Sequence, residues 1–199
     1  MLRRASQCHL AVFAITVFLA RIGHAQASPT ATQRLHVAAF AGGTDVLTGL
    51  IAGKNIDITA GADLTLLSYN VLRPSLELRG AYPVNKDYVA SERSFLVGPR
   101  FGRSFGSLNP YVDIFVGRGR IEYLNGGYAS DNILYLSSIT TIYSPGLGLD
   151  YDLSRRLALK MDFQYQCWKS PVVASGAIHP QSFTVGAVYR LDFNRRRRR

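Results

Sequence analysis

The sequence has few cysteines and, after its first residues, no long apolar run. Its two cysteines are Cys8 and Cys167. Cys8 lies in a segment that we expect to be removed, so the mature chain keeps one cysteine and cannot form an internal disulfide, on which small secreted soluble domains often depend. No stretch after residue 25 approaches the roughly 18 apolar residues of a membrane-spanning helix. A membrane location would therefore require strands.

The first 25 residues are typical of a secretory signal peptide. Arg3 and Arg4 give a positive start, and residues 10–20 form a short apolar core. Small residues around Ala25 then match a cleavage site. We predict cleavage before Gln26, with cleavage before Ser28 as the alternative, and a short buried helix is the other interpretation of this segment. Residues 26–33 are predicted to be a disordered lead-in, 34–193 one domain, and 194–199 a basic disordered tail.

A basic domain face is also missing, although the chain carries a net charge of +10. Removing residues 1–25 takes away three arginines and no acids, which leaves 20 − 13 = +7. Five of these charges are Arg195 and the four arginines after it, so the body carries only 7 − 5 = +2. Nucleic-acid binding needs a basic stripe and a recognisable reader fold. We therefore expect no nucleic-acid partner.

What the sequence does have is a period of two, which is typical of strands. Between residues 156 and 167 the odd positions are mostly large and apolar, and the even positions are polar or small. The segment that ends at Phe193 repeats this pattern. Six further segments follow it, at residues 35–42, 56–67, 71–82, 93–104, 111–124 and 139–151. The alternation is least regular in 111–124, where we predict a bulge at Gly117 or Gly119 that switches the phase.

The connections between these eight segments alternate in length. Short turns are predicted at 68–70, 105–110 and 152–155, and longer loops at 44–55, 83–92, 125–138 and 168–180. Short turns at one end and long loops at the other are typical of an antiparallel up-and-down barrel. In bacterial outer-membrane barrels the short turns are periplasmic and the longer loops extracellular. The fold class predicted is therefore all-β, an eight-stranded antiparallel up-and-down transmembrane barrel.

Periodicity alone leaves open which face of the wall points outward. A soluble lipocalin-like barrel, secreted and binding an apolar small molecule inside, is the alternative. The polar face carries opposite charges that could pair inside a narrow barrel: Asp57, Asp63, Arg73, Glu77, Arg79, Arg100, Lys160, Asp162, Arg190 and Asp192. Aromatic residues gather near segment ends, as in the girdles of membrane barrels: Tyr69, Tyr82, Phe101, Phe105, Tyr111, Tyr123, Tyr143, Tyr151, Phe183, Tyr189 and Phe193. We predict that the apolar face points outward.

With its signal sequence, eight amphipathic segments and a last strand ending Val188-Tyr189-Arg190-Leu191-Asp192-Phe193, the chain resembles the small OmpA-type outer-membrane barrels over residues 34–193. The resemblance implies a monomer in the outer membrane of a bacterial cell, in contact with membrane lipids and lipopolysaccharide. It also implies that the barrel-assembly machinery recognises the last strand through Phe193. The arginine-rich residues after Phe193 depart from the family pattern.

Some barrels of this size that resemble the chain modify lipid A with a histidine, a serine and an acid. Here Ser182 follows His179 by three residues, whereas the deacylase-like pattern would place it two residues on; His36 is the other mature histidine. We predict no enzyme activity, with a lipid A-modifying enzyme as the less favoured alternative. Two scattered histidines and one cysteine lack metal-ligand spacing, so no metal or cofactor is expected.

Binding and structural roles are left. Eight strands enclose an interior just wide enough for side chains, so we predict a lumen plugged by its polar face rather than an open pore. The loop residues 125–132 have a composition suited to surface contacts, and Trp168 and Lys169 are predicted to lie at the outer interface. We therefore predict an integral outer-membrane protein with a structural or surface-interaction role.

Overall fold

The computed structural model describes residues 36–50, 53–65, 72–85, 90–130 and 133–191. The predicted signal peptide, the lead-in, Tyr69, the last-strand residues Asp192 and Phe193, and the arginine-rich tail lie outside the described residues. Among the described residues, no helix is long and apolar enough to cross a membrane.

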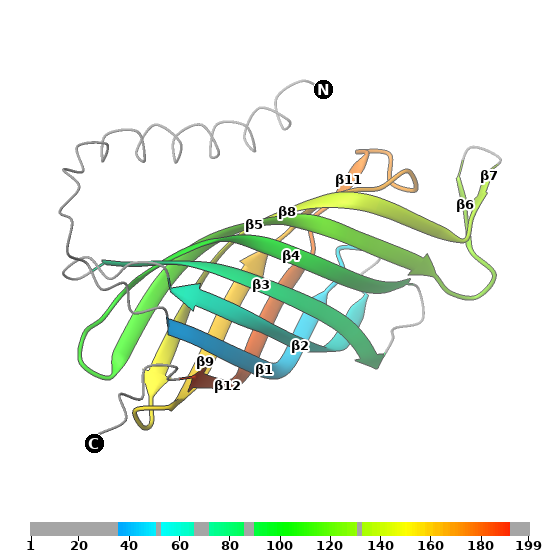
Figure 1. The fold of residues 1–199 in the computed structure, drawn as a ribbon. Coiled ribbons are helices and arrows are strands. Elements are labelled where there is room, and N and C mark those ends of the chain that lie inside the picture. The colour runs from blue at the N-terminus through cyan, green and yellow to red at the C-terminus, as the bar shows by residue number, and fades with distance from the viewer. Residues whose placement is uncertain (1–35, 51–52, 66–71, 86–89, 131–132, 192–199) are drawn as a thin grey trace, which may run out of the picture. The chain divides into compact units, whose positions relative to one another are not determined.

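Eight long strands form the wall of a closed antiparallel barrel (Figure 1). They are β1 (His36–Leu47), β2 (Lys54–Thr65), β3 (Leu72–Asn85), β4 (Ala90–Arg103), β5 (Leu108–Tyr123), β8 (Ser137–Asp152), β9 (Leu157–Tyr165) and β12 (Gln181–Leu191). Each strand pairs with the next in this order, and β12 pairs with β1 to close the wall. No strand edge of this wall is left open, as a spanning barrel requires. The predicted fold is confirmed.

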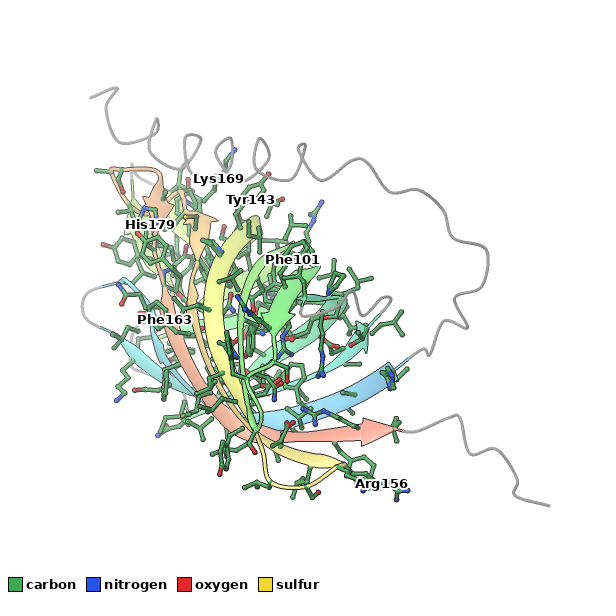
Figure 2. The ribbon with its side chains drawn as sticks, turned by 90° about the vertical axis from the view of Figure 1, so that its left-hand side faces the viewer. Phe101, Tyr143, Arg156, Phe163, Lys169 and His179 are labelled. Carbon is green, nitrogen blue, oxygen red and sulfur yellow. The ribbon has the colours of Figure 1, made fainter. Side chains whose placement is uncertain are left out.

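Four short strands belong to the longer connections. β6 (Tyr128–Ser130) and β7 (Ile133–Tyr135) form a hairpin between β5 and β8, in a segment predicted as a loop. β10 (Cys167–Lys169) pairs with β8 on one side and with β11 (Ala177–Ile178) on the other. The connections β4–β5, at 104–107, and β8–β9, at 153–156, are short and define what we call the turn end. The opposite end is the loop end; Arg156 lies at the turn end, and Lys169 and His179 at the loop end (Figure 2).

The two faces of the wall differ sharply in polarity. Leu147 and Val112 point outward and are 59% and 58% exposed, whereas Lys160 and Asp162 point inward and are at most 1% exposed. A soluble lipocalin-like barrel would show the reverse arrangement. That alternative is wrong, and the predicted outward apolar face is confirmed.

The bulge predicted in β5 is wrong. β5 keeps a single register with β8 along its length, and its odd-numbered side chains face inward throughout, including Gly117 and Gly119. What changes is the polarity of the two faces. The outward residues change from apolar to charged between Val116 and Arg118, and the inward residues become apolar at Ile121. The alternation was irregular because β5 leaves the apolar outer band and continues beyond it, with charges outside and apolar residues inside.

The same exchange explains why β1 extends past its predicted end. β1 was predicted to end at residue 42 but runs to Leu47, with buried Thr44 and Val46 inward and exposed Asp45 outward. Tyr111 and Tyr123 were assigned to the aromatic girdles, but both face the lumen and are buried. Other members of the predicted girdles are exposed on the outside: Tyr82, Phe105, Tyr143, Tyr151, Phe183 and Tyr189.

Candidate functional site

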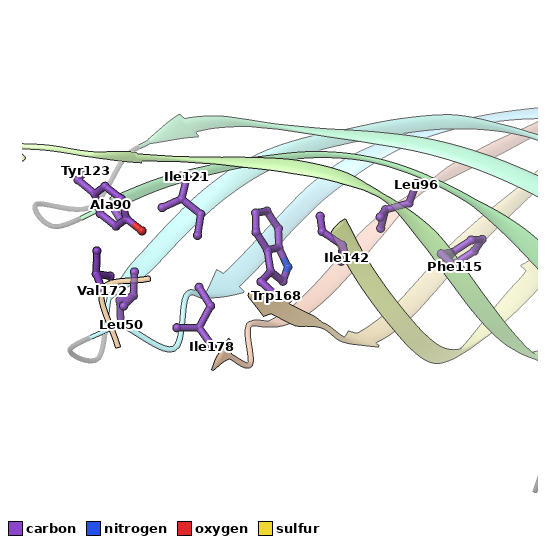
Figure 3. Close-up of a cluster of buried hydrophobic side chains, with 10 residues drawn as sticks. All are labelled: Leu50, Ala90, Leu96, Phe115, Ile121, Tyr123, Ile142, Trp168, Val172 and Ile178. Carbon is purple, nitrogen blue, oxygen red and sulfur yellow. The ribbon is translucent and has the colours of Figure 1, made fainter. Parts of the chain in front are cut away.

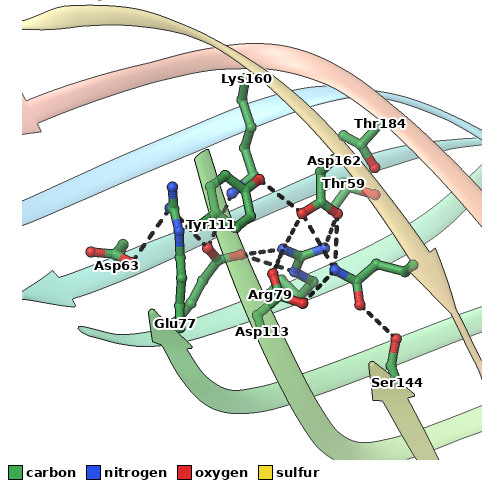
Figure 4. A network of polar contacts seen from close by, with 12 residues as sticks. Thr59, Asp63, Glu77, Arg79, Tyr111, Asp113, Ser144, Lys160, Asp162 and Thr184 are labelled. Atoms are coloured by element: carbon green, nitrogen blue, oxygen red, sulfur yellow. Dashed lines mark hydrogen bonds and ion pairs between the residues drawn. The ribbon is translucent and has the colours of Figure 1, made fainter. Parts of the chain in front are cut away.

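A network of buried ion pairs fills the middle of the lumen (Figure 4). Strand alternation turns Glu77 and Arg79 of β3, Arg100 of β4, and Lys160 and Asp162 of β9 inward. Arg79 Nε donates to Glu77 Oε1 at 2.9 Å, and Lys160 Nζ donates to Glu77 Oε2 at 3.1 Å. Arg79 Nη1 donates to Asp162 Oδ1 across the lumen at 2.6 Å. Each of these charges has an opposite partner, which its burial requires.

Aromatic and amide side chains pack around this network. The Arg79 guanidinium lies 4.4 Å from the centroid of the Phe115 ring, and Tyr111 Oη donates to Asp162 Oδ2 at 2.9 Å. Gln164 Nε2 donates to Asp113 Oδ1 at 2.8 Å. A Cβ on Gly146 would collide with the Gln164 amide. The inward glycine therefore leaves the space that the larger polar side chains occupy.

An apolar cluster occupies the lumen between this network and the loop end (Figure 3). Its members are Leu50, Ala90, Leu96, Phe115, Ile121, Tyr123, Ile142, Trp168, Val172 and Ile178. Trp168 is 2% exposed, and its Nε1 donates to Gln166 Oε1 at 2.7 Å. The predicted place of Trp168 at the outer interface is wrong. Even-numbered residues of β9 face inward and Trp168 continues that phase, while Lys169 is exposed.

The geometry matches solved membrane barrels. No protein-family model matches the chain, and no curated protein does so either. The crystal structure of Neisserial surface protein A aligns with a TM-score of 0.51 and 14% identity, over 80% of this chain and 97% of that one. The attachment invasion locus protein Ail of Yersinia pestis aligns with a TM-score of 0.49 and 11% identity, over 80% and 99%. The chain has the fold of the small outer-membrane β-barrels.

The outer-membrane enzyme PagL also aligns, with a TM-score of 0.45 and 13% identity over 77% of this chain and 98% of PagL. A shared fold does not fix function, so activity has to be argued from the side chains of this barrel.

The residues weighed for catalysis are not brought together in this barrel. His36 lies at the turn end of β1, and His179 lies at the loop end, where it is exposed and stacks on Tyr165 with ring centroids 5.6 Å apart. Ser182 points into the lumen and is 6% exposed. His179 and Ser182 are therefore on opposite sides of the wall. Among the described residues, no group of three or more His, Cys, Asp or Glu side chains could hold a metal ion.

A cavity of about 320 Å³ opens into the barrel at its turn end. Arg73, Arg155 and Arg190 are among the residues that line it, and Arg100 lies on its wall beside the ion-pair network. Arg190 Nη2 lies 2.5 Å from Asp152 Oδ1. Neither Arg73 nor Arg155 has an ion pair among the described residues. This mouth of the barrel is therefore basic and attracts anions.

On the outer wall, a groove of about 610 Å³ runs over β2–β5 and β8. Apolar side chains such as Ile58 and Phe95 line it, with small residues such as Gly80 between them. Arg93, Arg118 and Arg120 also line it. Arg93 Nη2 and Arg120 Nε lie 2.6 Å and 3.4 Å from Glu122 Oε1. Three cations against one acid leave this part of the outer wall positive, beside an apolar surface.

Sequence reasoning identified most inward charges but missed Glu92 and Asp113. Glu92 was assigned to a loop, although it continues the inward even-numbered phase of Leu96 and Arg100 in β4. Asp113 lies in β5, where the irregular alternation hid its inward direction. Extending the phase of β4 past its apolar band would have found Glu92, and keeping one phase along the whole of β5 would have found Asp113.

Proposed function

We propose that the chain is an integral outer-membrane protein with a structural or surface-interaction role rather than an open pore or an enzyme. The observation that carries the proposal is the polarity of the wall, with large apolar side chains outside and buried ion pairs inside. Such a wall is stable in a lipid bilayer, where backbone groups are satisfied by strand pairing and apolar side chains face lipid. The separation of His179 from Ser182 supports a role other than catalysis.

Two features of the lumen support a plugged barrel. The ion-pair network crosses the lumen between β3 and β9, with Arg79 and Asp162 in direct contact. The apolar cluster then fills the lumen toward the loop end, and Ile121, Ile142 and Phe115 are fully buried within it. An ion passing through the lumen would have to break the contacts of the ion-pair network and then lose its hydration shell in the apolar cluster.

The proposed partners are the lipids of the outer leaflet, lipopolysaccharide above all. The outer groove would accept an acyl chain, and Arg118 and Arg120 would pair with a phosphate at its loop-end edge, because guanidinium groups bind phosphate strongly. The last strand, through Phe193, is proposed to engage the barrel-assembly machinery during insertion. A closed wall needs no second copy to complete it, which supports a monomer.

The first experiment locates the protein and tests its folded state. Cells are fractionated, and the outer-membrane fraction is run unboiled and boiled on a detergent gel. A closed spanning barrel stays folded in cold detergent and changes mobility on boiling. The purified barrel is then examined by native mass spectrometry, which should show a monomer with bound lipopolysaccharide. The double variant Arg118→Ala/Arg120→Ala should carry less bound lipopolysaccharide than the wild type.

Recovery from the periplasm without detergent would overturn the membrane proposal. Equal lipopolysaccharide on the double arginine variant would overturn the lipid partner while leaving the membrane location intact. Thr141→Ala, on the outward face of β8 beside Arg118, is the matched control and should keep its lipid.

A further inference from the structure

The lumen contains more buried acids than buried bases. Among the described residues the buried bases are Arg79, Arg100 and Lys160. The buried acids are Asp57, Asp63, Glu77, Glu92, Asp113, Asp150 and Asp162. With all ten ionised, the lumen would carry 3 − 7 = −4. Buried charge of one sign is costly unless a counter-charge accompanies it.

Half of this excess lies at two side chains, Asp57 of β2 and Glu92 of β4. The other five acids each lie within 4.0 Å of a nitrogen of a buried base. Asp57 and Glu92 have no ion pair among the described residues, and each is only 3% exposed. Within the described part of the chain, Oδ1 of Asp57 and both carboxylate oxygens of Glu92 have no hydrogen-bond partner. Buried polar atoms without a partner are rare and call for an explanation such as an ion.

Both carboxylates line one small cavity, of about 20 Å³, between the ion-pair network and the apolar cluster. A space of roughly 10–15 Å³ is enough for one water-sized occupant. Hydroxyl groups line the same cavity, including those of Thr44, Thr59 and Ser182. Thr44 Oγ1 lies 2.6 Å from Thr59 Oγ1 and 2.8 Å from Thr184 Oγ1, so three threonine hydroxyls form a hydrogen-bonded row. Arg79, whose charge is already paired with Glu77 and Asp162, and apolar side chains such as Leu96 and Trp168 also line it. The cavity thus presents two unpaired carboxylates and several hydroxyl and amide oxygens beside an apolar wall.

We propose that Asp57 and Glu92 hold a Ca²⁺ ion in this cavity. A doubly positive ion balances the two carboxylates, and Ca²⁺ takes about six to eight oxygen ligands, including hydroxyl and water oxygens, in flexible geometry. Mg²⁺ fits less well, because it demands near-octahedral geometry and gives up its waters reluctantly. A site with three acidic ligands is not formed by the described residues, so hydroxyl oxygens and the amide oxygens of Gln164 and Gln166 in the cavity wall complete the coordination. The bound ion joins β2 to β4 across β3.

Trp168 provides a direct probe of this site. It is the chain's single tryptophan, and it lines the same cavity. The barrel is refolded in detergent with Tb³⁺, which replaces Ca²⁺ and luminesces when a nearby excited indole transfers energy to it. The wild type should show this emission on selective tryptophan excitation, and Ca²⁺ should abolish it by competition. The melting temperature should also rise with Ca²⁺ and fall back with a chelator.

Three variants make the test specific. Asp57→Asn/Glu92→Gln should lose the emission and the Ca²⁺-dependent melting shift, while the mobility change on boiling confirms that it folds. Trp168→Phe should lose the emission but keep the melting shift. Asp45→Asn, which changes an exposed acid paired with Lys54 at the same end of the barrel, should keep both.

Two outcomes would overturn the proposal. A wild type that shows no emission and no Ca²⁺-dependent melting shift would mean that the two carboxylates are neutralised by protons. Emission that persists in Asp57→Asn/Glu92→Gln would mean that the ion binds elsewhere on the barrel.

Discussion

At the scale of single residues, Glu77 joins three cations of the lumen. It accepts from Arg79 and Lys160, and its Oε2 lies 3.3 Å from Arg100 Nη1. Among the described residues Glu77 is the one acid that pairs with Lys160, so Glu77→Ala would leave this buried cation without an ion pair and would remove one partner each from Arg79 and Arg100. Removing one partner of a buried ion pair costs about 3–5 kcal/mol. We expect a loss of this size in the free energy of unfolding, measured by urea titration in detergent and followed by Trp168 fluorescence.

Glu122→Ala is the matched control. Glu122 pairs with Arg93 on the outer wall, where the two side chains are 30% and 40% exposed. Exposed pairs contribute about 0–1 kcal/mol, so this variant should unfold almost like the wild type. Equal losses for Glu77→Ala and Glu122→Ala would contradict the central role of the buried network.

The inward direction of these charges could be predicted from the sequence, but their partners could not. A period of two places Glu77 and Arg79 on one face of their strand whatever the rest of the chain does. Arg79 meets Asp162, however, which lies 83 residues further on and across the lumen. That contact depends on barrel closure and on the stagger between strands, which local alternation does not determine.

At the scale of strands, the polarity of the two faces is exchanged along β5 and β1, which hides the ends of these strands in the sequence pattern. A rule that the apolar face points outward holds only while the strand lies in lipid. Beyond Val116 the outward residues are Arg118 and Arg120, and the inward ones join the apolar cluster. The regular strands β9 and β12 were predicted well because most of their length lies within the apolar band.

The exchange predicts where a charge on β5 and β8 is tolerated. Val112 lies midway along the outward apolar residues of β5, whereas Ile139 of β8 pairs with Arg120 near the loop end. Arginine at a bilayer midplane costs about 2–4 kcal/mol and about 0–1 kcal/mol near the interface. We expect Val112→Arg to destabilise the barrel folded in lipid vesicles by the larger amount and Ile139→Arg by the smaller, measured as the loss in the free energy of unfolding. Equal costs would place the lipid boundary elsewhere.

At the scale of the whole molecule, the lumen is a series of layers between its two mouths. The basic cavity at the turn end leads to the ion-pair network, then to the small cavity lined by Asp57 and Glu92, and then to the apolar cluster. An ion would cross these layers one after another, so the most resistant layer sets the conductance. Opening the barrel should therefore require changes in two layers at once.

Conductance across planar bilayers tests this serial arrangement. The wild type should show no stable open-channel current. Trp168→Ala removes the largest side chain of the apolar cluster but leaves the ion pairs, and Arg79→Ala removes a cation that bridges the lumen but leaves the cluster. Each should stay closed, and the double variant should conduct, with the mobility change on boiling confirming that all of them fold. Stable current through the wild type would contradict the plugged barrel. Current through Trp168→Ala alone would show that the ion-pair network is permeable and that the apolar cluster is the barrier.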